Sequence, residues 1–145
     1  MTHSIVAAHV DAMQFAHDLS RDNMAAWRAR GSWDTSVFDA SWPNTENFEI
    51  HEAGIRIGVV RITPDDDALY VSDLQILPGH QNRGGGSFAL RYVERLALER
   101  ALGHVRLRAF TYSRAAKLYR RLGFLPIARD GAKVLLEKRI EPPEK

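Results

Sequence analysis

Apolar and polar positions follow two different periods along the chain, and each period predicts an element. Residues 3–9 are expected to form a short first strand. From Val10 to Arg30, apolar residues recur at helical spacing, which predicts one helix or two ending at Gly31. From Phe48 to Thr63, apolar residues alternate with polar or small ones around Ala53-Gly54. This alternation is typical of a hairpin of half-buried strands.

The second half of the chain reads as strand, helix, strand, helix and a closing pair of strands. A strand over 68–77 ends at Pro78-Gly79, and turn residues precede it at Pro64–Asp67. The remaining elements are expected at 87–102, 105–110, 114–122, 124–128 and 133–139. This order predicts the α/β (α+β) class, with a mixed sheet and helices packed on it.

Length and composition favour one domain over residues 1–140, followed by a frayed tail at 141–145. The sequence holds no cysteine, which excludes disulfides, thiolate metal sites and a cysteine nucleophile. The six histidines show no ligand spacing, so no metal is expected. No apolar run approaches the roughly 20 residues of a membrane span, and no signal peptide is evident, so the protein is expected to be cytoplasmic.

Charge is distributed unevenly. Residues 1–79 hold five Arg or Lys against twelve Asp or Glu, whereas residues 80–121 hold ten against two. A basic middle third indicates an anionic partner, or else a solvated helix face. Nucleic acid is not expected as that partner, because the arginines are spread over two helices and a strand without interleaved aromatic residues.

The segment from Leu74 to Ser87 carries the most chemistry, because a strand there leads into a glycine-rich loop that opens a helix. Glycines let backbone amides approach a ligand, and the first amides of a helix lack internal partners. Together they form an anion site suited to a diphosphate. The spacing is neither a P-loop nor the dinucleotide fingerprint. The alternative is that the glycines form only a flexible connection.

Two motifs resemble the GNAT acetyltransferase superfamily. Gln81–Gly86 is similar to its acyl-CoA motif, Gln/Arg-x-x-Gly-x-Gly/Ala, and Leu74–Pro78 resembles the fourth strand before that motif. Ala115–Phe124 resembles its Ala-x-x-Leu/Phe-Tyr-x-x-x-Gly-Phe signature. The resemblance covers roughly residues 47–139. Two positions depart from the family pattern. Tyr112 stands where an Asn is frequent, or else one residue is deleted there, and Gly85 stands where a larger residue is frequent.

The resemblance implies a mixed, mostly antiparallel sheet of roughly six to seven strands, with helices on both faces and a splay between its fourth and fifth strands. It also implies N-acetyl transfer from acetyl-CoA to a primary amine by direct attack in a ternary complex. The pantetheine arm would lie against Gln75 and Ile76. The diphosphate would lie on the loop residues Gln81, Asn82, Arg83, Gly84, Gly85, Gly86 and Ser87.

Roles follow for several side chains. The resemblance makes Tyr119 the acid that protonates the leaving thiolate; the alternative is a packing aromatic. Asp73 lies two residues before Gln75, on the same side of the strand, and is the first candidate base. It is alternatively a salt-bridged surface residue. Glu49 is the second candidate base.

The acceptor is expected at the N-terminal third of the chain. Trp33 and Trp27 are candidate contacts for a cationic amine, or else they fill the core. The amine, a small molecule or a peptide, is unidentified, and the resemblance implies a homodimer as one assembly. A non-catalytic acyl-CoA sensor on the same fold is the alternative function.

Overall fold

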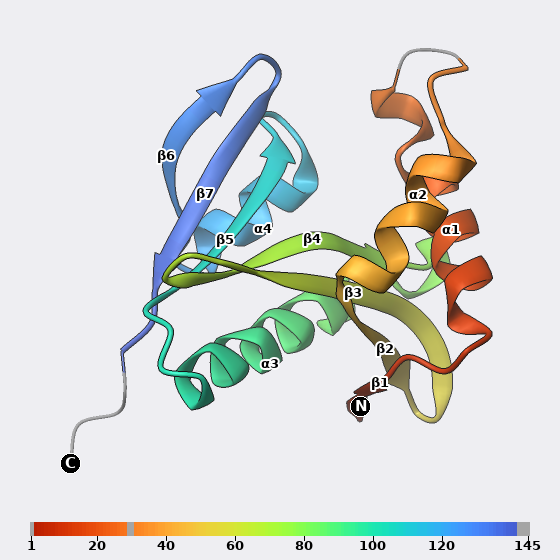
Figure 1. Cartoon of the computed structure of the whole chain (residues 1–145), viewed down its shortest axis with the longest axis horizontal. Helices are drawn as coiled ribbons and strands as arrows, with labels where there is room; N and C mark the ends of the chain where they lie inside the picture. Colours follow the sequence, from red (N-terminus) through yellow and green to blue (C-terminus); the bar gives the residue numbers. More distant parts are fainter. Residues whose placement is uncertain (1, 29–30, 142–145) are drawn as a thin grey trace. The chain divides into compact units, whose positions relative to one another are not determined.

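The computed structural model describes residues 2–28 and 31–141. Seven strands in these residues form a sheet in the order β1-β2-β3-β4-β5-β7-β6 (Figure 1). β4 and β5 pair in parallel, and the pairs β1–β2, β2–β3, β5–β7 and β6–β7 are antiparallel. The strands are β1 His3–Ala7, β2 Glu46–Glu52, β3 Ile55–Asp65, β4 Ala68–Ile76, β5 His104–Phe110, β6 Leu125–Asp130 and β7 Lys133–Arg139. The expected mixed, mostly antiparallel sheet is confirmed.

Four α-helices accompany the sheet in the described residues. They are α1 Ala12–Asn23, α2 Thr35–Ser41, α3 Gly85–Glu99 and α4 Arg114–Arg121. Short 3₁₀ turns occur at Ala25–Trp27, Trp42–Asn44 and Pro78–His80. No helix in the described part of the chain is long and apolar enough to cross a membrane.

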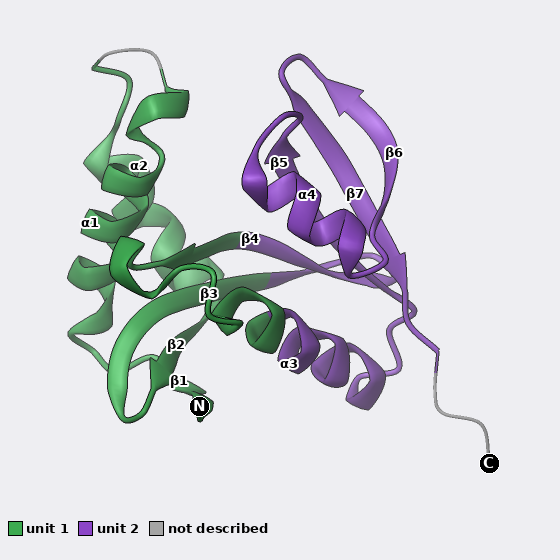
Figure 2. Cartoon of the chain, turned by 180° about the vertical axis from the view of Figure 1, so that it is seen from behind, with its two compact units in different colours: residues 1–62, 73–89 green, residues 63–72, 90–145 purple. Residues whose placement is uncertain are grey.

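The chain divides into two compact units (Figure 2). Unit 1 comprises Met1–Ile62 and Asp73–Ala89, and unit 2 comprises Thr63–Ser72 and Leu90–Lys145. The division passes through β3, β4 and α3. A single domain over 1–140 stays a prediction, and the expected frayed tail lies outside the described residues from position 142 onward.

In unit 1, the β2–β3 hairpin turns at Ala53-Gly54, where both residues have positive φ. α1 and α2 pack together over the hairpin through a cluster of Ala16, Phe38 and Val59. Partly buried apolar side chains surround this cluster: Met13, Phe15, Trp33 and Trp42. The helical spacing read from the sequence therefore marks a face that is buried in the structure.

In unit 2, β4 and β5 pair from Ala68 and His104 to Val71 and Leu107. Both strands continue beyond this pairing, to Ile76 and Phe110. The end of the pairing matches the expected splay between the fourth and fifth strands.

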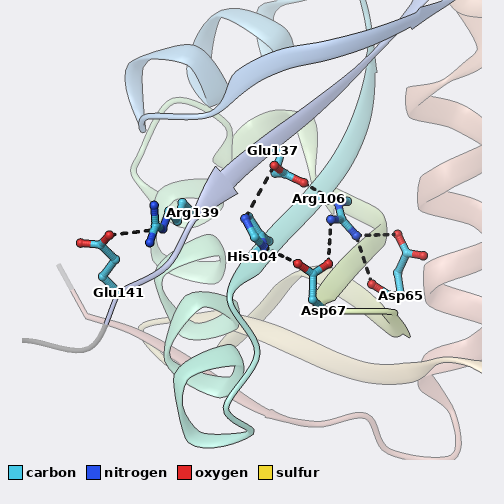
Figure 3. A network of polar contacts seen from close by, with 7 residues as sticks. All are labelled: Asp65, Asp67, His104, Arg106, Glu137, Arg139 and Glu141. Carbon is cyan, nitrogen blue, oxygen red and sulfur yellow. Dashed lines mark hydrogen bonds and ion pairs between the residues drawn. The ribbon is translucent and has the colours of Figure 1, made fainter.

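Ion pairs join the β3–β4 turn to β5 and β7 within unit 2 (Figure 3). Arg106 on β5 donates to Glu137 on β7 at 2.6 Å and to Asp67 at 2.8 Å. It also donates to the backbone oxygen of Asp65 at 3.1 Å. His104 lies 2.9 Å from Asp67. The network raises the pKa of Arg106, first through its hydrogen bond to Glu137.

Several element boundaries differ from the expectation, and two of them have a clear physical reason. β3 continues through Pro64 to Asp65, so the turn consists of Asp66 and Asp67 alone. Pro64 is exposed, and a proline is tolerated where its missing N–H is not needed. α3 ends at Glu99, earlier than expected, because the Leu102 amide returns to the Ala97 carbonyl and closes the helix.

Candidate functional site

The glycine-rich loop has a defined backbone path in unit 1. Asn82 and Gly84 take positive φ, at 62° and 90°. The Phe88 amide is bonded to the Gly84 carbonyl. The amides of the three preceding residues, 85–87, belong to the first turn of α3, where no earlier turn supplies acceptors. The sequence expected α3 to begin at Ser87; it begins at Gly85, so two glycines form the first turn.

Two glycines allow a close approach of β3, β4 and the start of α3. A Cβ on Gly58 would lie 2.3 Å from the Gln75 carbonyl oxygen and 2.8 Å from Cδ1 of Ile76. A Cβ on Gly85 would lie 3.3 Å from that same Cδ1. The Ile76 side chain thus fills the space beneath the helix start. The Leu77 amide donates to the Ile57 carbonyl at 2.8 Å, which holds the end of β4 against β3.

A chain of polar side chains runs along β4. Gln75 donates to Asp73 at 2.8 Å, so the two predicted residues do lie on the same side of the strand. Asn23, the last residue of α1, donates to the Gln75 side chain at 3.1 Å and to the Ile76 carbonyl at 2.9 Å. Gln81 from the loop donates to that carbonyl at 3.0 Å. The backbone oxygen of Ile76 is therefore bound by side chains from two sides.

Asp73 occupies an environment that favours its neutral form. Burial raises the pKa of the Asp73 carboxyl above its ordinary value. Hydrogen bonds from Gln75 and Ser20 and the positive charge of Arg61 oppose this shift without cancelling it. Arg61 is itself buried, and its guanidinium lies over the rings of Phe38 and Trp42. A carboxyl with a raised pKa is suited to proton exchange.

Glu49, the second candidate base, is a buried structural residue. Its carboxylate accepts from the His9 amide at 2.7 Å and lies 3.0 Å from His51. Arg56 lies 3.8 Å from the same carboxylate. These contacts link the segment that follows β1 to β2 and β3, so Glu49 serves packing better than proton transfer.

Arg83 does not present its guanidinium as a free charge. Its Nε donates to both carboxylate oxygens of Glu52, at 3.2 and 3.0 Å. Glu52 is the last residue of β2 and is 3% exposed. Arg83 is one of the loop residues expected at the diphosphate, and in the structure its Nε is bonded to a buried carboxylate.

The two tryptophans expected at the acceptor site lie in different settings within unit 1. The Trp33 indole N–H donates to His17 at 2.9 Å, and its ring packs against the cluster around Phe38. Trp27 lies in the Ala25–Trp27 turn and is 44% exposed. Trp33 therefore supports the core, while contact of either residue with an acceptor stays a prediction.

Tyr119 is buried on α4 in unit 2, with its ring 6.1 Å from that of Phe124. The Phe124 amide closes the helix on the Tyr119 carbonyl, and Gly123 between them has φ of 98°. The acid role of Tyr119 stays a prediction. Tyr112, which replaces the frequent Asn, is 86% exposed.

Sequence reasoning missed two residues near the loop, Asn23 and Glu52. Asn23 shows no signal in the sequence, because a polar residue at a helix end is common. Glu52 reads as an ordinary polar position of a hairpin, and its contacts are separated from it by some 30 residues. Within residues 2–28 and 31–141, no group of three or more His, Asp or Glu is arranged to hold a metal ion.

Known structures share this fold. The ribosomal-protein-S18-alanine N-acetyltransferase of Escherichia coli aligns with a TM-score of 0.75 at 16% identity, over 99% of this chain and 97% of that one. A GNAT-family acetyltransferase of Staphylococcus aureus aligns with a TM-score of 0.79 at 11% identity, over 97% and 100%. The PaiA N-acetyltransferase of Thermoplasma acidophilum, solved in complex with coenzyme A, aligns with a TM-score of 0.75 at 14% identity, over 96% and 99%.

A search of curated proteins found no significant match to the sequence. The model of the acetyltransferase (GNAT) family matches residues 12–124, which is most of the chain and includes both motifs. The match extends through α1 and α2, beyond the region where the two motifs alone carry the resemblance. The chain therefore belongs to the acetyltransferase (GNAT) family.

Proposed function

We propose that this protein transfers the acetyl group of acetyl-CoA to a primary amine. The observation that carries the proposal is the continuous segment of β4, glycine-rich loop and α3 start. It combines the part of β4 that continues beyond its pairing with β5, a loop of defined path and the first-turn amides of a helix. Family membership supports acetyl transfer, and one structural neighbour was solved with coenzyme A.

The donor would bind along this segment. The amides of residues 85–87 and the positive end of the α3 dipole suit the diphosphate. The pantetheine arm would lie at Ile76, where the side chains of Asn23 and Gln81 now donate to the carbonyl. An amide of the arm offers the same kind of donor, so it would replace these hydrogen bonds rather than leave the oxygen unsatisfied.

The chemistry needs two proton transfers and one charge stabilisation. The neutral amine attacks the thioester carbonyl, and a tetrahedral intermediate forms. As the C–S bond breaks, the thiolate takes a proton from Tyr119, and the nitrogen gives up its proton to a base. The backbone amide near Ile76 would stabilise the oxyanion.

Asp73 is the base that the described contacts favour. Its raised pKa gives it a stronger affinity for a proton than an exposed carboxylate has. Its hydrogen bond with Gln75 fixes the orientation of the carboxyl group on the side of β4 that contacts Asn23. Glu49 is held by His9, His51 and Arg56 and is not proposed for this role.

The acceptor is an amine whose class is open. One structural neighbour acts on the alanine of a ribosomal protein, as its name states. The N-terminal elements α1 and α2 are the proposed acceptor wall, with Trp27 as the more exposed candidate contact. Trp33 would contribute its ring face, because its N–H is already bonded to His17.

Substitution of Tyr119 by Phe tests the acid role. The phenyl ring keeps the packing against Phe124 while the hydroxyl is lost. Turnover with an accepted amine should fall by roughly 10²-fold or more, as for the loss of a general acid. Binding of coenzyme A, measured by calorimetry, should change little. Unchanged turnover would show that another group protonates the thiolate.

A further inference from the structure

A buried carboxylate at the end of β2 gathers basic side chains behind the glycine-rich loop. Glu52 is 3% exposed, and its carboxylate lies 3.0 Å from Nδ1 of His80. Arg83 donates to both of its oxygens, and Nε2 of His3 lies 4.0 Å away. The hydrogen bond with His80, and then that with Arg83, lowers the pKa of Glu52. The carboxylate is therefore ionised across the physiological range.

Two of these partners lie on either side of a left-handed residue in the loop. His80 and Arg83 flank Asn82, whose φ of 62° is rarely adopted by a residue with a side chain. Gln81 is bound to the Ile76 carbonyl. The side chains at positions 80, 81 and 83 are thus all engaged by the protein. The backbone of the loop, continued by Gly84 and Gly85, is not occupied by these three bonds.

The third basic side chain lies directly behind the loop glycines. Nε2 of His3 is 3.7 Å from the position of a Cβ on Gly85, and Cε1 is 3.8 Å from one on Gly84. The ring of His3 packs near that of Phe88 on α3, with centroids 5.6 Å apart. His3 side-chain exposure is only 9%, and its Nε2 has no hydrogen-bond partner among the described residues. The loop therefore rests on a filled surface, and the ligand side is the opposite one.

Through these contacts Glu52 orders the loop, although its negative charge alone would oppose an anionic ligand. A carboxylate behind a diphosphate site repels the ligand, but here the guanidinium of Arg83 is paired with it at hydrogen-bond distance. A loop with three successive glycines would otherwise lose much conformational entropy when its amides are ordered by a ligand. Fixing two of its side chains on one buried group removes part of that cost before binding.

We propose that Glu52 is a positioning residue that holds the loop backbone in its diphosphate-binding form through Arg83 and His80. The proposal rests on the proposed function, because it assumes that the acyl donor is a coenzyme A thioester. Arg83 then acts on the loop and not on the phosphates. Its contribution to binding depends on Glu52.

The test compares Glu52→Gln with the parent protein, using Glu99→Gln as the control. Glu99 is an exposed residue of α3, and its substitution makes the same change in charge. Calorimetry should show coenzyme A binding weakened roughly tenfold in Glu52→Gln, the size expected when a preorganised site is loosened. The KM for S-acetylpantetheine, which lacks the diphosphate, should not change.

The alternative role for Arg83 predicts an opposite change in coenzyme A affinity. If Arg83 binds the phosphates directly and Glu52 only restrains it, Glu52→Gln should bind coenzyme A as tightly as the parent or more tightly, and this result would overturn the proposal. An equal loss for S-acetylpantetheine would also overturn it, since it would reveal general disruption. Should Glu52→Gln not fold, His80→Gln removes one of the two contacts and should weaken coenzyme A binding in the same selective way.

Arg83→Gln supplies an independent measurement through a double-mutant cycle. If Arg83 acts through Glu52, the double variant should bind coenzyme A about as weakly as either single variant. Additive losses would contradict that coupling. Failure of the parent protein to bind coenzyme A would instead refute the proposed function, so the two failures are distinguishable.

Discussion

At the scale of single residues, the surroundings of Asp73 directly change its affinity for a proton. Its carboxyl is ordered by Gln75 and Ser20 and lies in the field of Arg61, yet burial still raises its pKa. Two consequences follow from the upward shift of the Asp73 pKa. The group binds a proton more readily than a solvated aspartate, and ionising it costs folding free energy.

We expect Asp73→Asn to lower transfer by about 10²-fold, the contribution typical of a general base. In the parent, kcat/KM should rise with pH through the raised pKa of Asp73, and this rise should be absent in the variant. A pH–rate profile checks both points. A variant that retains the parent's profile would show that Asp73 is not the base.

The same substitution has a signature in stability that does not depend on activity. Well below pH 3.8, the ordinary pKa of an aspartate, the carboxyl is protonated in both the folded and unfolded states. As pH rises above that value, the unfolded state ionises first, so the parent loses stability until the folded-state pKa is passed. Asn never ionises. Thermal melts should therefore favour Asp73→Asn increasingly from acid to neutral pH, and the reverse trend would contradict the raised pKa.

At the scale of elements, the close approach of β3 to the end of β4 depends on Gly58. A Cβ there would collide with the backbone oxygen of Gln75, which cannot rotate away as a side chain would. The strand must shift, and β4 carries the Ile76 groups proposed to bind the pantetheine arm.

Gly58→Ala should therefore lower the free energy of unfolding by about 1–3 kcal/mol, the range for overpacked interiors. It should also weaken coenzyme A binding. Gly79→Ala is a matched control, because a Cβ there meets no atom within 4 Å. Chemical denaturation and calorimetry measure the two effects. If Gly58→Ala matched the control in both, the strand ends would not be as close as described.

The ion-pair network of unit 2 gives the second prediction at this scale. Arg106 connects the β3–β4 turn to β7, and its partner Glu137 is likewise largely buried, with side-chain exposures of 18% and 21% (Figure 3). Arg106→Gln should destabilise the protein by about 1 kcal/mol, since charged hydrogen bonds in partly buried sites contribute little more than that. The loss should shrink at low pH, because Arg106 lowers the pKa of Asp67 and that stabilisation disappears as Asp67 is protonated.

Arg129→Gln is the control for this network. Arg129 is exposed on the edge strand β6, so its substitution changes the charge equally without removing these contacts. Urea unfolding at several pH values makes the comparison. Equal destabilisation by the two variants, or a loss in Arg106→Gln that grows in acid, would contradict the assigned role of the network.

Helices and strands can be predicted from the sequence where the spacing of apolar residues or a turn residue marks their ends. The alternation around Ala53-Gly54 places the β2–β3 hairpin correctly, and Gly123 marks the end of α4. The end of α3 was misplaced because Ala101, not a glycine, takes the left-handed conformation there, with φ of 58°. Sequence chemistry assigns such a position to glycine, and the structure does not follow that preference.

At the scale of the whole molecule, two local motifs were enough to indicate the family, and the family match extends over α1 and α2 as well. The detailed site was less accessible. The partners of Arg83 and Ile76 come from β2 and α1, some 30 and 53 residues away. The sequence around Arg83 or Ile76 does not predict which distant residues will contact them. The uneven charge predicts an anionic ligand, but it does not show that Arg83 is bonded to Glu52.

The central claim is acetyl transfer, and release of free thiol from acetyl-CoA tests it most directly. The parent protein should be assayed with small amines, polyamines, amino acids and peptides with free N-termini, each against an amine-free blank. We predict thiol release above the blank with at least one class, accompanied by an equal amount of N-acetylated product. Tight binding of acetyl-CoA with no release for any class would contradict the claim and would favour an acyl-CoA sensor.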